Sequence, residues 1–251
     1  MKTKIILALL PLLAGACSPT AEYFPAKQAT EVNPDTHLVL RFKEAPAVGE
    51  AGFIRIWDAV SGECVDSLDL SLPSGLTESR TYGDDCDYTK VPYDYSRSFI
   101  PTNRNTIPGT PSGTAEPTPR DMQLTIIGGF TDGFRFHPVI VHDNTATIYP
   151  HNNMLEYGHE YYVTIDDGAI VCGGFKGVKK GEWSFSTKAS GPADPRHLSV
   201  NADGSGDFNT VQGALDAVLD FCGEVTTIEI AAGDYEEIVY ARNKTNVIIR
   251  G

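Results

Sequence analysis

The chain has 251 residues, of which 41% are hydrophobic and 21% charged, a composition typical of a globular protein rather than a collagen-like or disordered one. Its formal net charge of −13 argues against binding nucleic acid or an anionic membrane through a basic face. We therefore expect no nucleic-acid partner, and the sequence contains no dense Lys/Arg cluster that would form a groove for a polyanion.

The N-terminus predicts export. Residues 1–17, MKTKIILALLPLLAGAC, combine two lysines, a short apolar run and small residues before Cys17. This pattern is typical of a secretory signal and is too short to span a membrane as a mature helix. The segment LAGAC resembles a bacterial lipobox, which implies lipidation of Cys17 and an anchor to the outer membrane, on either its periplasmic or its cell-surface face. An ordinary signal peptide with a chance cysteine is the alternative.

Residues 18–30 are polar and contain proline, which favours a tether between the lipid and a first domain. From residue 31 to 188, short segments alternate apolar and polar residues between turn signals, and this alternation predicts strands. We expect an antiparallel β-sandwich with a long insertion over 77–121. The predicted strands cover 37–42, 53–58, 134–142, 145–150, 161–166 and 183–188, and a hairpin turn is expected over 142–144.

The sandwich region resembles the bacterial Ig-like domains that open many secreted proteins. The resemblance rests on NPDTHLVLRF (33–42), MLEYGHEYYV (154–163) and WSFST (183–187). It departs from the family in the insertion, which is rich in Tyr, Pro, Asp and Thr. The tyrosines of the insertion either stack on sugars or pin a long loop to the sheet; they are Tyr82, Tyr88, Tyr93 and Tyr95.

The cysteines and histidines show no metal-binding pattern. The four cysteines after Cys17 contain no CxxC pair and lack a histidine at zinc spacing, so we expect no metal and no cofactor. Export permits disulfides, with Cys64–Cys86 the favoured pair and free buried thiols the alternative. The histidines are expected to be surface or hydrogen-bonded structural residues; they are His137, His142, His151 and His159.

Residues 189–196 have the Gly- and Pro-containing composition of a linker, and NADGSGDFNTVQGALDAV (201–218) follows soon after it. An EF-hand loop would need Gly and Glu where the sequence has Phe208 and Ala214. A dinucleotide fingerprint lacks its third glycine, and no P-loop lysine follows. The segment is therefore interpreted as scaffold: a glycine turn, then a helix capped by Thr210 or Asn209.

The predicted helix has one buried face, formed by Val211, Ala214, Leu215, Val218, Leu219 and Cys222. Asp203 and Asp207 are expected to bond to backbone amides of the turn and of the helix start. Asp216 and Asp220 lie four residues apart, which suggests either a solvated helix face or an acid/base pair; we favour the solvated face.

A first strand over 197–200 precedes the helix, and short strands are predicted over 226–232, 237–240 and 247–251. This order predicts a capping helix followed by the first coil of a right-handed parallel β-helix. The expected fold is all-β: an Ig-like β-sandwich over 31–188, then a truncated β-helix over 197–251. Because one coil cannot bury its stacking face, we expect 191–251 to be poorly stable alone and to belong to a longer enzyme or a broken gene.

Three motifs in this last region resemble the opening of pectin methylesterases (pectinesterases): DGSGDFNTVQGALDAV (203–218), IEIAAGDYEE (228–237) and KTNVIIRG (244–251). Some pectate lyases carry versions of the first. The motif positions to which we assign structural roles are Asp203, Gly204, Gly206, Asp207, Phe208, Thr210, Gly233, Tyr235, Glu237 and Gly251.

The resemblance implies an enzyme that hydrolyses the methyl esters of galacturonate units in pectin. Such enzymes use one aspartate as nucleophile and a second as acid and base, with glutamines at the oxyanion and no metal. These catalytic residues lie in later coils, so none is assigned in this chain and we expect it to be inactive by itself. The alternatives are another β-helix carbohydrate enzyme, such as a pectate lyase, and a non-catalytic Ig-like glycan-binding lipoprotein.

Overall fold

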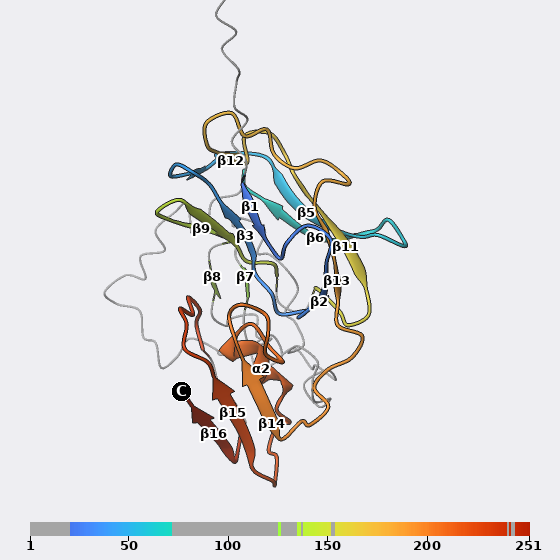
Figure 1. Cartoon of the computed structure of the whole chain (residues 1–251), viewed down its shortest axis with the longest axis vertical. Coiled ribbons are helices and arrows are strands. Elements are labelled where there is room, and N and C mark those ends of the chain that lie inside the picture. The colour runs from blue at the N-terminus through green and yellow to red at the C-terminus, as the bar shows by residue number, and fades with distance from the viewer. Residues whose placement is uncertain are drawn as a thin grey trace, which may run out of the picture.

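The computed structural model describes residues 21–71, 125–126, 135–136, 138–151, 154–239, 241 and 244–251. In these residues strands predominate and α2 is the one helix, so the prediction of an all-β chain is confirmed. Figure 1 shows a β-sandwich in the upper part of the view, with α2 and three further strands below it. The predictions made for Cys17, Cys86, His137 and the insertion over 77–121, with its four tyrosines, fall outside the described residues.

The first sheet of the sandwich has the strand order β1-β3-β10-β9, and all of its neighbours are antiparallel. Its side chains alternate between a buried and a partly exposed face, because successive residues of a strand point to opposite sides. The strands are β1 (Glu22–Phe24), β3 (Leu38–Arg41), β10 (Thr145–Ile148) and β9 (Val139–His142).

The second sheet has the order β2-β13-β11-β5-β6 and is antiparallel except where β2 runs parallel to β13. Its strands are β2 (Ala29–Val32), β13 (Ser184–Thr187), β11 (Glu160–Ile165), β5 (Phe53–Asp58) and β6 (Cys64–Asp69). Two small two-stranded sheets pair β4 (Ala47–Val48) with β12 (Ile170–Val171) and β7 (Thr125–Ile126) with β8 (Arg135–Phe136).

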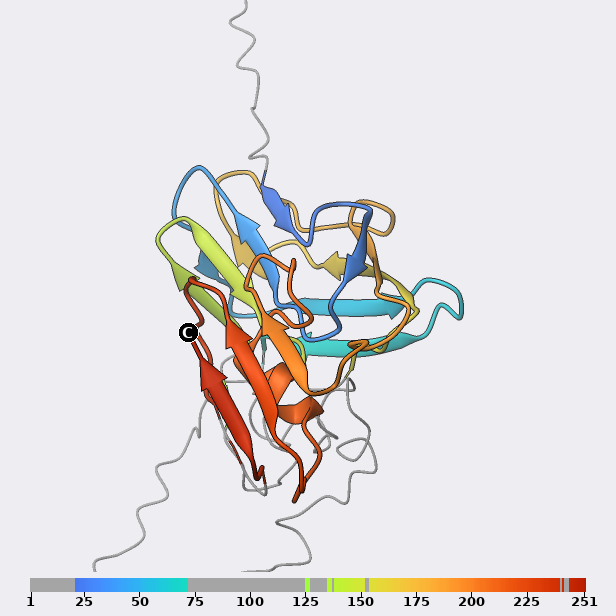
Figure 2. The same ribbon diagram turned by 60° about the horizontal axis from the view of Figure 1, so that its bottom comes forward.

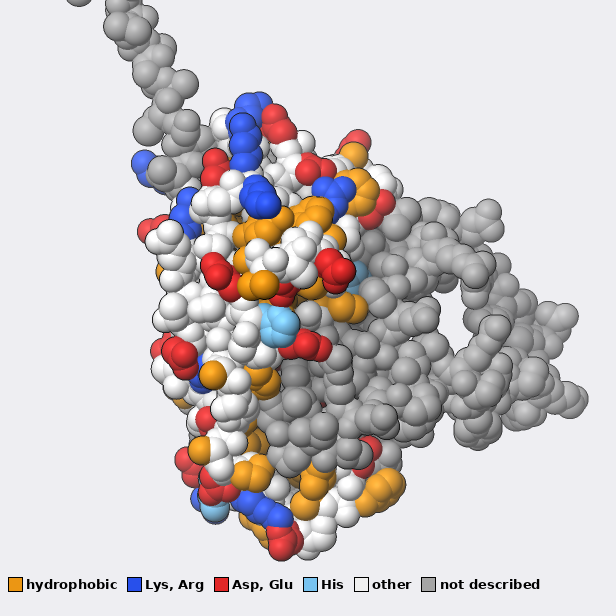
Figure 3. Space-filling view, turned by 90° about the vertical axis from the view of Figure 1, so that its right-hand side faces the viewer, with side chains coloured by type: hydrophobic (Ala, Val, Ile, Leu, Met, Phe, Trp, Pro, Cys, Tyr) orange, Lys and Arg blue, Asp and Glu red, His pale blue; other side chains and the backbone are white. Residues whose placement is uncertain are grey.

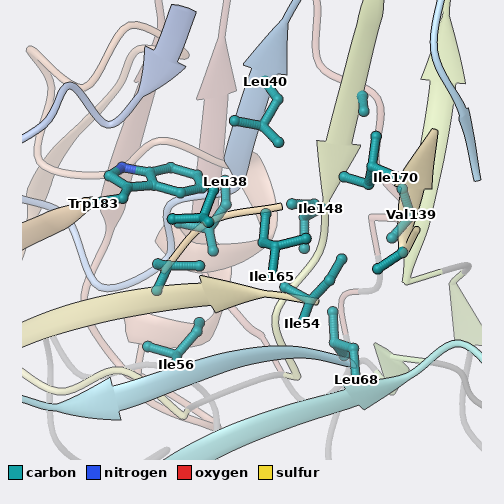
Figure 4. Packing of buried hydrophobic residues seen from close by; sticks show 14 of the residues in the cluster. Leu38, Leu40, Ile54, Ile56, Leu68, Val139, Ile148, Ile165, Ile170 and Trp183 are labelled. Carbon is teal, nitrogen blue, oxygen red and sulfur yellow. The ribbon is translucent and has the colours of Figure 1, made fainter. Parts of the chain in front are cut away.

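The two sheets share one hydrophobic core. Leu38 and Leu40 from β3 meet Ile54 and Ile56 from β5, and all four side chains are buried (Figure 4). Trp183 is fully buried beside them, and its indole nitrogen donates a hydrogen bond to the carbonyl of Pro25 at 2.9 Å. Buried aromatic rings contribute more apolar area than other side chains. The ring of Trp183 and its hydrogen bond therefore tie the start of the described chain to the last strand of the sandwich.

The predicted tether over 18–30 is corrected by the structure. Residues 22–24 and 29–32 are β1 and β2, which add one strand to each sheet of the sandwich. The ring of Tyr23 packs edge-on against Trp183 with centroids 5.0 Å apart. This packing buries part of a segment that looks polar in sequence.

The other predicted sandwich strands are present, with one interruption. The run over 134–142 divides into β8 and β9 around Pro138, which has no backbone N–H to donate to a sheet. The predicted hairpin turn joins β9 to β10 through Asp143, whose φ of 48° lies in the left-handed region. The Asn144 amide reinforces the turn by donating to the carbonyl of Phe42 at 2.7 Å.

Beyond the sandwich, three parallel strands form one sheet in the order β14-β15-β16, seen side by side in Figure 2. They are β14 (His197–Val200), β15 (Thr226–Ile230) and β16 (Val247–Arg250), and α2 (Val211–Ala217) lies between β14 and β15 in the chain. The helix and the sheet share a second buried cluster that includes Leu198, Phe208, Leu215 and Ile228. Contrary to prediction, 237–239 form no strand, so the strands do not follow one another around a single coil.

The surface described by the structure is mixed in charge. On the face seen in Figure 3, basic side chains lie among acidic and apolar ones. No described helix has the length and apolar character needed to cross a membrane. Cys64 (exposed), Cys172 (buried) and Cys222 are free thiols in the described part of the chain, and Cys86, the predicted partner of Cys64, lies outside it.

Asp58 supplies a testable pH dependence of sandwich stability. The His159 imidazole, 2.8 Å from the carboxylate, and the amides of Ser61 and Val60 lower the pKa of Asp58 from 3.8 to about 2. A carboxyl with a lowered folded-state pKa stabilises the fold above its unfolded pKa and loses that contribution as pH falls through the folded value. In urea unfolding, Asp58→Asn should be less stable than wild type at pH 7, and the gap should close between about pH 4 and pH 2.

The control is the same substitution in a His159→Ala background. Since His159 is the largest cause of the lowered pKa, the pH-dependent part of the gap should shrink there. A gap that is equally large at pH 2 and pH 7 would contradict this account.

Candidate functional site

Side-chain hydrogen bonds reinforce the turn over 201–209, which is also closed by a backbone hydrogen bond from the Asn201 amide to the Phe208 carbonyl at 2.9 Å. The Asp207 carboxylate accepts from both the amide and the hydroxyl of Ser199, at 2.9 and 2.7 Å. Asp203 accepts from the Ser205 amide at 2.8 Å, and hydrogen bonds from Ser205 hold the pKa of Asp203 below its usual range. Asp203 thus bonds within the turn as predicted, whereas Asp207 bonds to β14 instead of the helix start.

The two turn glycines permit close approaches. Gly204 has a φ of +87°, a conformation that costs other residues energy. A Cβ on Gly206 would lie 2.8 Å from the amide nitrogen of Asn201. The Gly206 carbonyl accepts from Lys188 Nζ at 2.7 Å and from Asn33 Nδ2 at 3.2 Å, so the sandwich holds the turn directly. Phe208, buried in the second cluster, fixes the other side of the turn.

The N-terminus of α2 is satisfied by side chains from three places in the chain. Thr210 is the N-cap that the sequence predicts, and its hydroxyl accepts from the Gly213 amide at 2.9 Å. The Glu237 carboxylate accepts from the amides of Val211 and Gln212, each at 2.8 Å. Because the first amides of a helix lack intrahelical partners, these bonds replace water at a buried helix end.

The third contribution comes from the sandwich. Asp35 accepts from the Thr210 amide and hydroxyl, both at 2.8 Å, and from the Asn209 amide at 3.0 Å. Five successive amides, 209 to 213, are therefore bound by Asp35, Glu237 and Thr210. Two carboxylates also complement the positive end of the helix dipole. Sequence reasoning missed Asp35, which lies 175 residues before Thr210.

Gly213 leaves the space that Asp35 occupies. A Cβ at position 213 would lie 2.3 Å from Asp35 Oδ2, which is closer than non-bonded atoms approach. Glycine inside a helix costs about 1 kcal/mol relative to alanine, so a helix glycine in a buried segment is a sequence signal for a close approach. That signal identifies the position but not the partner.

Burial raises the pKa of both carboxyl groups at the helix end. For Asp35 burial outweighs the lowering by the hydrogen bonds from Thr210 and Asn209. For Glu237 burial outweighs the lowering by the Gln212 and Val211 amides, and the charge of Asp35 adds to the rise. The junction therefore concentrates two partly desolvated acids at one helix terminus.

The helix itself is shorter and more buried than predicted. It ends at Ala217, since Val218 is extended and its carbonyl accepts from Lys244 Nζ at 2.6 Å. Asp216 is buried and accepts from Gln212 Nε2 at 2.6 Å, so the predicted solvated face is wrong for this residue. Asp220 instead pairs with Lys244 at 2.7 Å. With separate partners, the two aspartates do not form an acid/base pair.

In place of the predicted strand, residues 237–239 form a loop from which the Glu237 side chain binds the helix end. In the same loop, Tyr235 donates through its hydroxyl to the carbonyl of Ala231 at 2.9 Å and packs on the second cluster. Gly233 lies under the Tyr235 ring, where a Cβ would contact the ring at 3.4 Å. Gly251 is exposed.

A groove of about 1110 Å³ lies where the outer face of the first sheet meets the turns around α2. Its floor consists of outward side chains of β1, β3 and β10, and its wall consists of residues 202–203, 209–210 and 233–237. In the view of Figure 2, the loops of the parallel sheet approach β9 and β10 from below. The lining brings together the motif residues Asp203, Thr210, Gly233, Tyr235 and Glu237.

The groove has an acidic lining with few cationic groups. Five carboxylates line it, whereas Arg41 is the single Lys or Arg among the described lining residues. Burial lowers the pKa of His37 to about 4, so its ring is neutral at pH 7. His37 packs against Tyr149 with ring centroids 4.4 Å apart, and burial followed by the nearby Glu236 raises the pKa of Tyr149. No three described His, Cys, Asp or Glu side chains converge as a metal site would require.

Of the four histidines in the prediction, the three that the structure describes form hydrogen bonds, but with carboxylates that sequence spacing does not indicate. His142 Nε2 lies 2.8 Å from Glu236 Oε1 and so links the sandwich to the loop after β15. His151 is buried with its Nδ1 2.6 Å from Asp66 Oδ1. His151 and His159 thus have structural roles inside the sandwich, and His142 borders the groove.

The described residues define an all-β chain in which a two-sheet sandwich docks onto a helix-capped parallel sheet. No protein-family model and no solved structure matches this chain.

The Asp35–Gly213 contact predicts a reversal of sign in a mutant cycle. Gly213→Ala should destabilise the wild-type chain, because the new methyl group displaces the Asp35 carboxylate from amides that are then unsatisfied. In an Asp35→Gly background, which also removes the Asp35 Cβ that would lie 2.9 Å from the new methyl group, the same change should become neutral or stabilise by up to about 1 kcal/mol, the usual helix preference for alanine. Urea unfolding combined with amide hydrogen exchange at residues 209–213 measures both effects.

Asp35→Ala alone should cost about 2–3 kcal/mol, since it leaves two buried amides without an acceptor. Equal effects of Gly213→Ala in both backgrounds would show that the two positions are not coupled.

Proposed function

We propose that the protein is a pectinesterase-type carbohydrate esterase in which these residues form the non-catalytic opening of the enzyme. In this proposal an Ig-like sandwich precedes the first strands of a right-handed parallel β-helix. The reaction hydrolyses the methyl esters of galacturonate units by a two-aspartate mechanism, with those aspartates in later coils. The protein is exported and lipid-anchored through Cys17.

The observation that carries the proposal is the helix-capped parallel sheet. β14, β15 and β16 pair in parallel and in register, and α2 packs over the apolar residues of the same sheet. Such stacking, with a short helix covering apolar side chains, is what the opening of a parallel solenoid requires. Residues of the family-like motifs form the turn before α2, the N-cap of α2 and the Glu237 carboxylate that binds the first amides of the helix.

The edge of the sheet also supports a continuing stack. Ile248 and Ile249 on β16 are 41% and 50% exposed, and β16 pairs with β15 alone among the described strands. Apolar side chains on an unpaired edge are stabilised by a further strand laid beside them. In the proposed fold, β14, β15 and β16 therefore belong to consecutive turns of the chain and not to three faces of one coil. They pair within a single sheet, and Glu237 lies in a loop.

A second candidate is a non-catalytic glycan-binding lipoprotein. The groove between sandwich and parallel sheet favours it, because aromatic and hydroxyl side chains line the groove while no nucleophile–base pair is evident among the described lining residues.

The test is to express the entire open reading frame that contains these codons and to assay methanol release from highly methyl-esterified pectin. The proposal expects methanol and free carboxylates to appear together, while residues 1–251 alone release none. The matched control is the full frame with the first Asp of its later coils changed to Asn.

Unsaturated oligosaccharide products would show that the enzyme is a lyase and not an esterase. If the product of the entire open reading frame binds pectin without releasing methanol, the second candidate, a non-catalytic glycan-binding lipoprotein, is supported.

A further inference from the structure

We infer that the groove between the first sandwich sheet and the loops around α2 is a binding site for an uncharged saccharide chain. The inference depends on how side chains are ordered across the sheet, on the charge of the lining and on which polar groups are left for a ligand. Only the choice of pectin as the saccharide rests on the proposed function.

The floor of the groove presents two parallel rows of different chemistry. One row is apolar along most of its length: Phe24 pairs with Val39, which pairs with Thr147. The next row is polar: Arg41 pairs with Thr145, which pairs with His142. A pyranose ring has apolar C–H faces and polar hydroxyl edges, so a chain lying across the strands meets matching surfaces on both rows.

The wall adds an aromatic side chain and carbonyl, amide and carboxylate groups. Tyr235, Asn209 and Asp203 belong to this wall, and the Phe24 ring reaches it, since it comes within 3.7 Å of where a Gly204 Cβ would be. Carboxylates and amides accept hydrogen bonds from hydroxyl groups and fix their orientation. The lining therefore combines apolar area with a few convergent polar groups, as ligand grooves do.

Two of the five lining carboxylates form no hydrogen bond or ion pair within the described structure. Glu237 is bound to the helix amides, and Glu236 lies against His142 and Tyr149. In contrast, no described hydrogen bond or ion pair engages the side chain of Asp143, in the turn between β9 and β10, or of Asp234, in the loop after β15, and both residues line the groove. These two groups are available to accept from a ligand.

The charge of the lining determines which chains enter. Like charges placed against one another in an interface weaken binding and slow association, so five lining carboxylates and a single arginine disfavour a polyuronate. Methyl esterification removes the charge of each galacturonate without removing its ring or hydroxyls. The groove therefore favours methyl-esterified over de-esterified segments, which at a pectinesterase separates substrate from product.

The experiment is isothermal titration of the purified 251-residue chain with four probes at low ionic strength. The probes are a fully methyl-esterified oligogalacturonide, the same oligomer de-esterified, a neutral galacto-oligosaccharide and oligolysine. We expect the esterified oligomer to bind at least about tenfold more tightly than the de-esterified one. Added salt should narrow that difference, because it screens the repulsion between the polyanion and the groove.

Two variants with matched controls locate the binding site. Phe24→Ala should weaken binding of the esterified oligomer by about fivefold to tenfold, whereas Phe221→Ala, at an exposed ring outside the lining, should not. Asp234→Lys should improve binding of the de-esterified oligomer, whereas Glu229→Lys, the same charge change on β15 outside the lining, should not. Retained thermal unfolding of each variant shows that it is folded.

The outcomes separate the groove from the proposed function. Binding of the galacto-oligosaccharide without either galacturonide supports the groove and removes pectin as its ligand. Absence of binding to all three saccharides, equal binding of both galacturonides, or preferential binding of oligolysine would overturn the inference. Tight esterified binding that Phe24→Ala leaves unchanged would also overturn it.

Discussion

The N-terminal end of one short helix connects the two parts of this protein. Asp35 from the sandwich and Glu237 from the loop after β15 supply acceptors for four consecutive amides, and Thr210 supplies the fifth. A buried helix end without these acceptors would leave several donors unsatisfied, each at a cost of about 1–3 kcal/mol. The position of α2, the turn before it and the groove beside it all follow from this arrangement.

Much of the sandwich is predictable because its strands are half-buried. In β5 the residues Ile54 and Ile56 face the core while their neighbours face outward, and this produces the alternation that the sequence displays. β1 and β2 escape the same reasoning, since one strand of three residues and another of four contain too few apolar positions for a pattern. Their place in the sandwich depends on partners far along the chain: Tyr23 of β1 packs against Trp183, and β2 pairs with β13.

The candidate site is less predictable, for a physical reason. Thr210 as an N-cap and the glycine turn are local features, so spacing reveals them. Asp35 follows a proline in a segment that reads as an ordinary turn, and nothing near it indicates a partner at residue 210. Asp216 looks like a solvated helix residue in sequence, because its burial comes from packing around the helix and not from its neighbours in sequence.

Gly213 has a consequence for how such chains vary. The missing side chain at this position leaves room for the Asp35 side chain, of which even the Cβ would lie 2.9 Å from an added methyl group. Positions 35 and 213, distant in sequence, are therefore expected to covary: any residue with a Cβ at position 35 favours glycine at 213, and an alanine at 213 requires the segment around residue 35 to move away. Exchanging the sandwich for another module would have to carry this pair across as a unit.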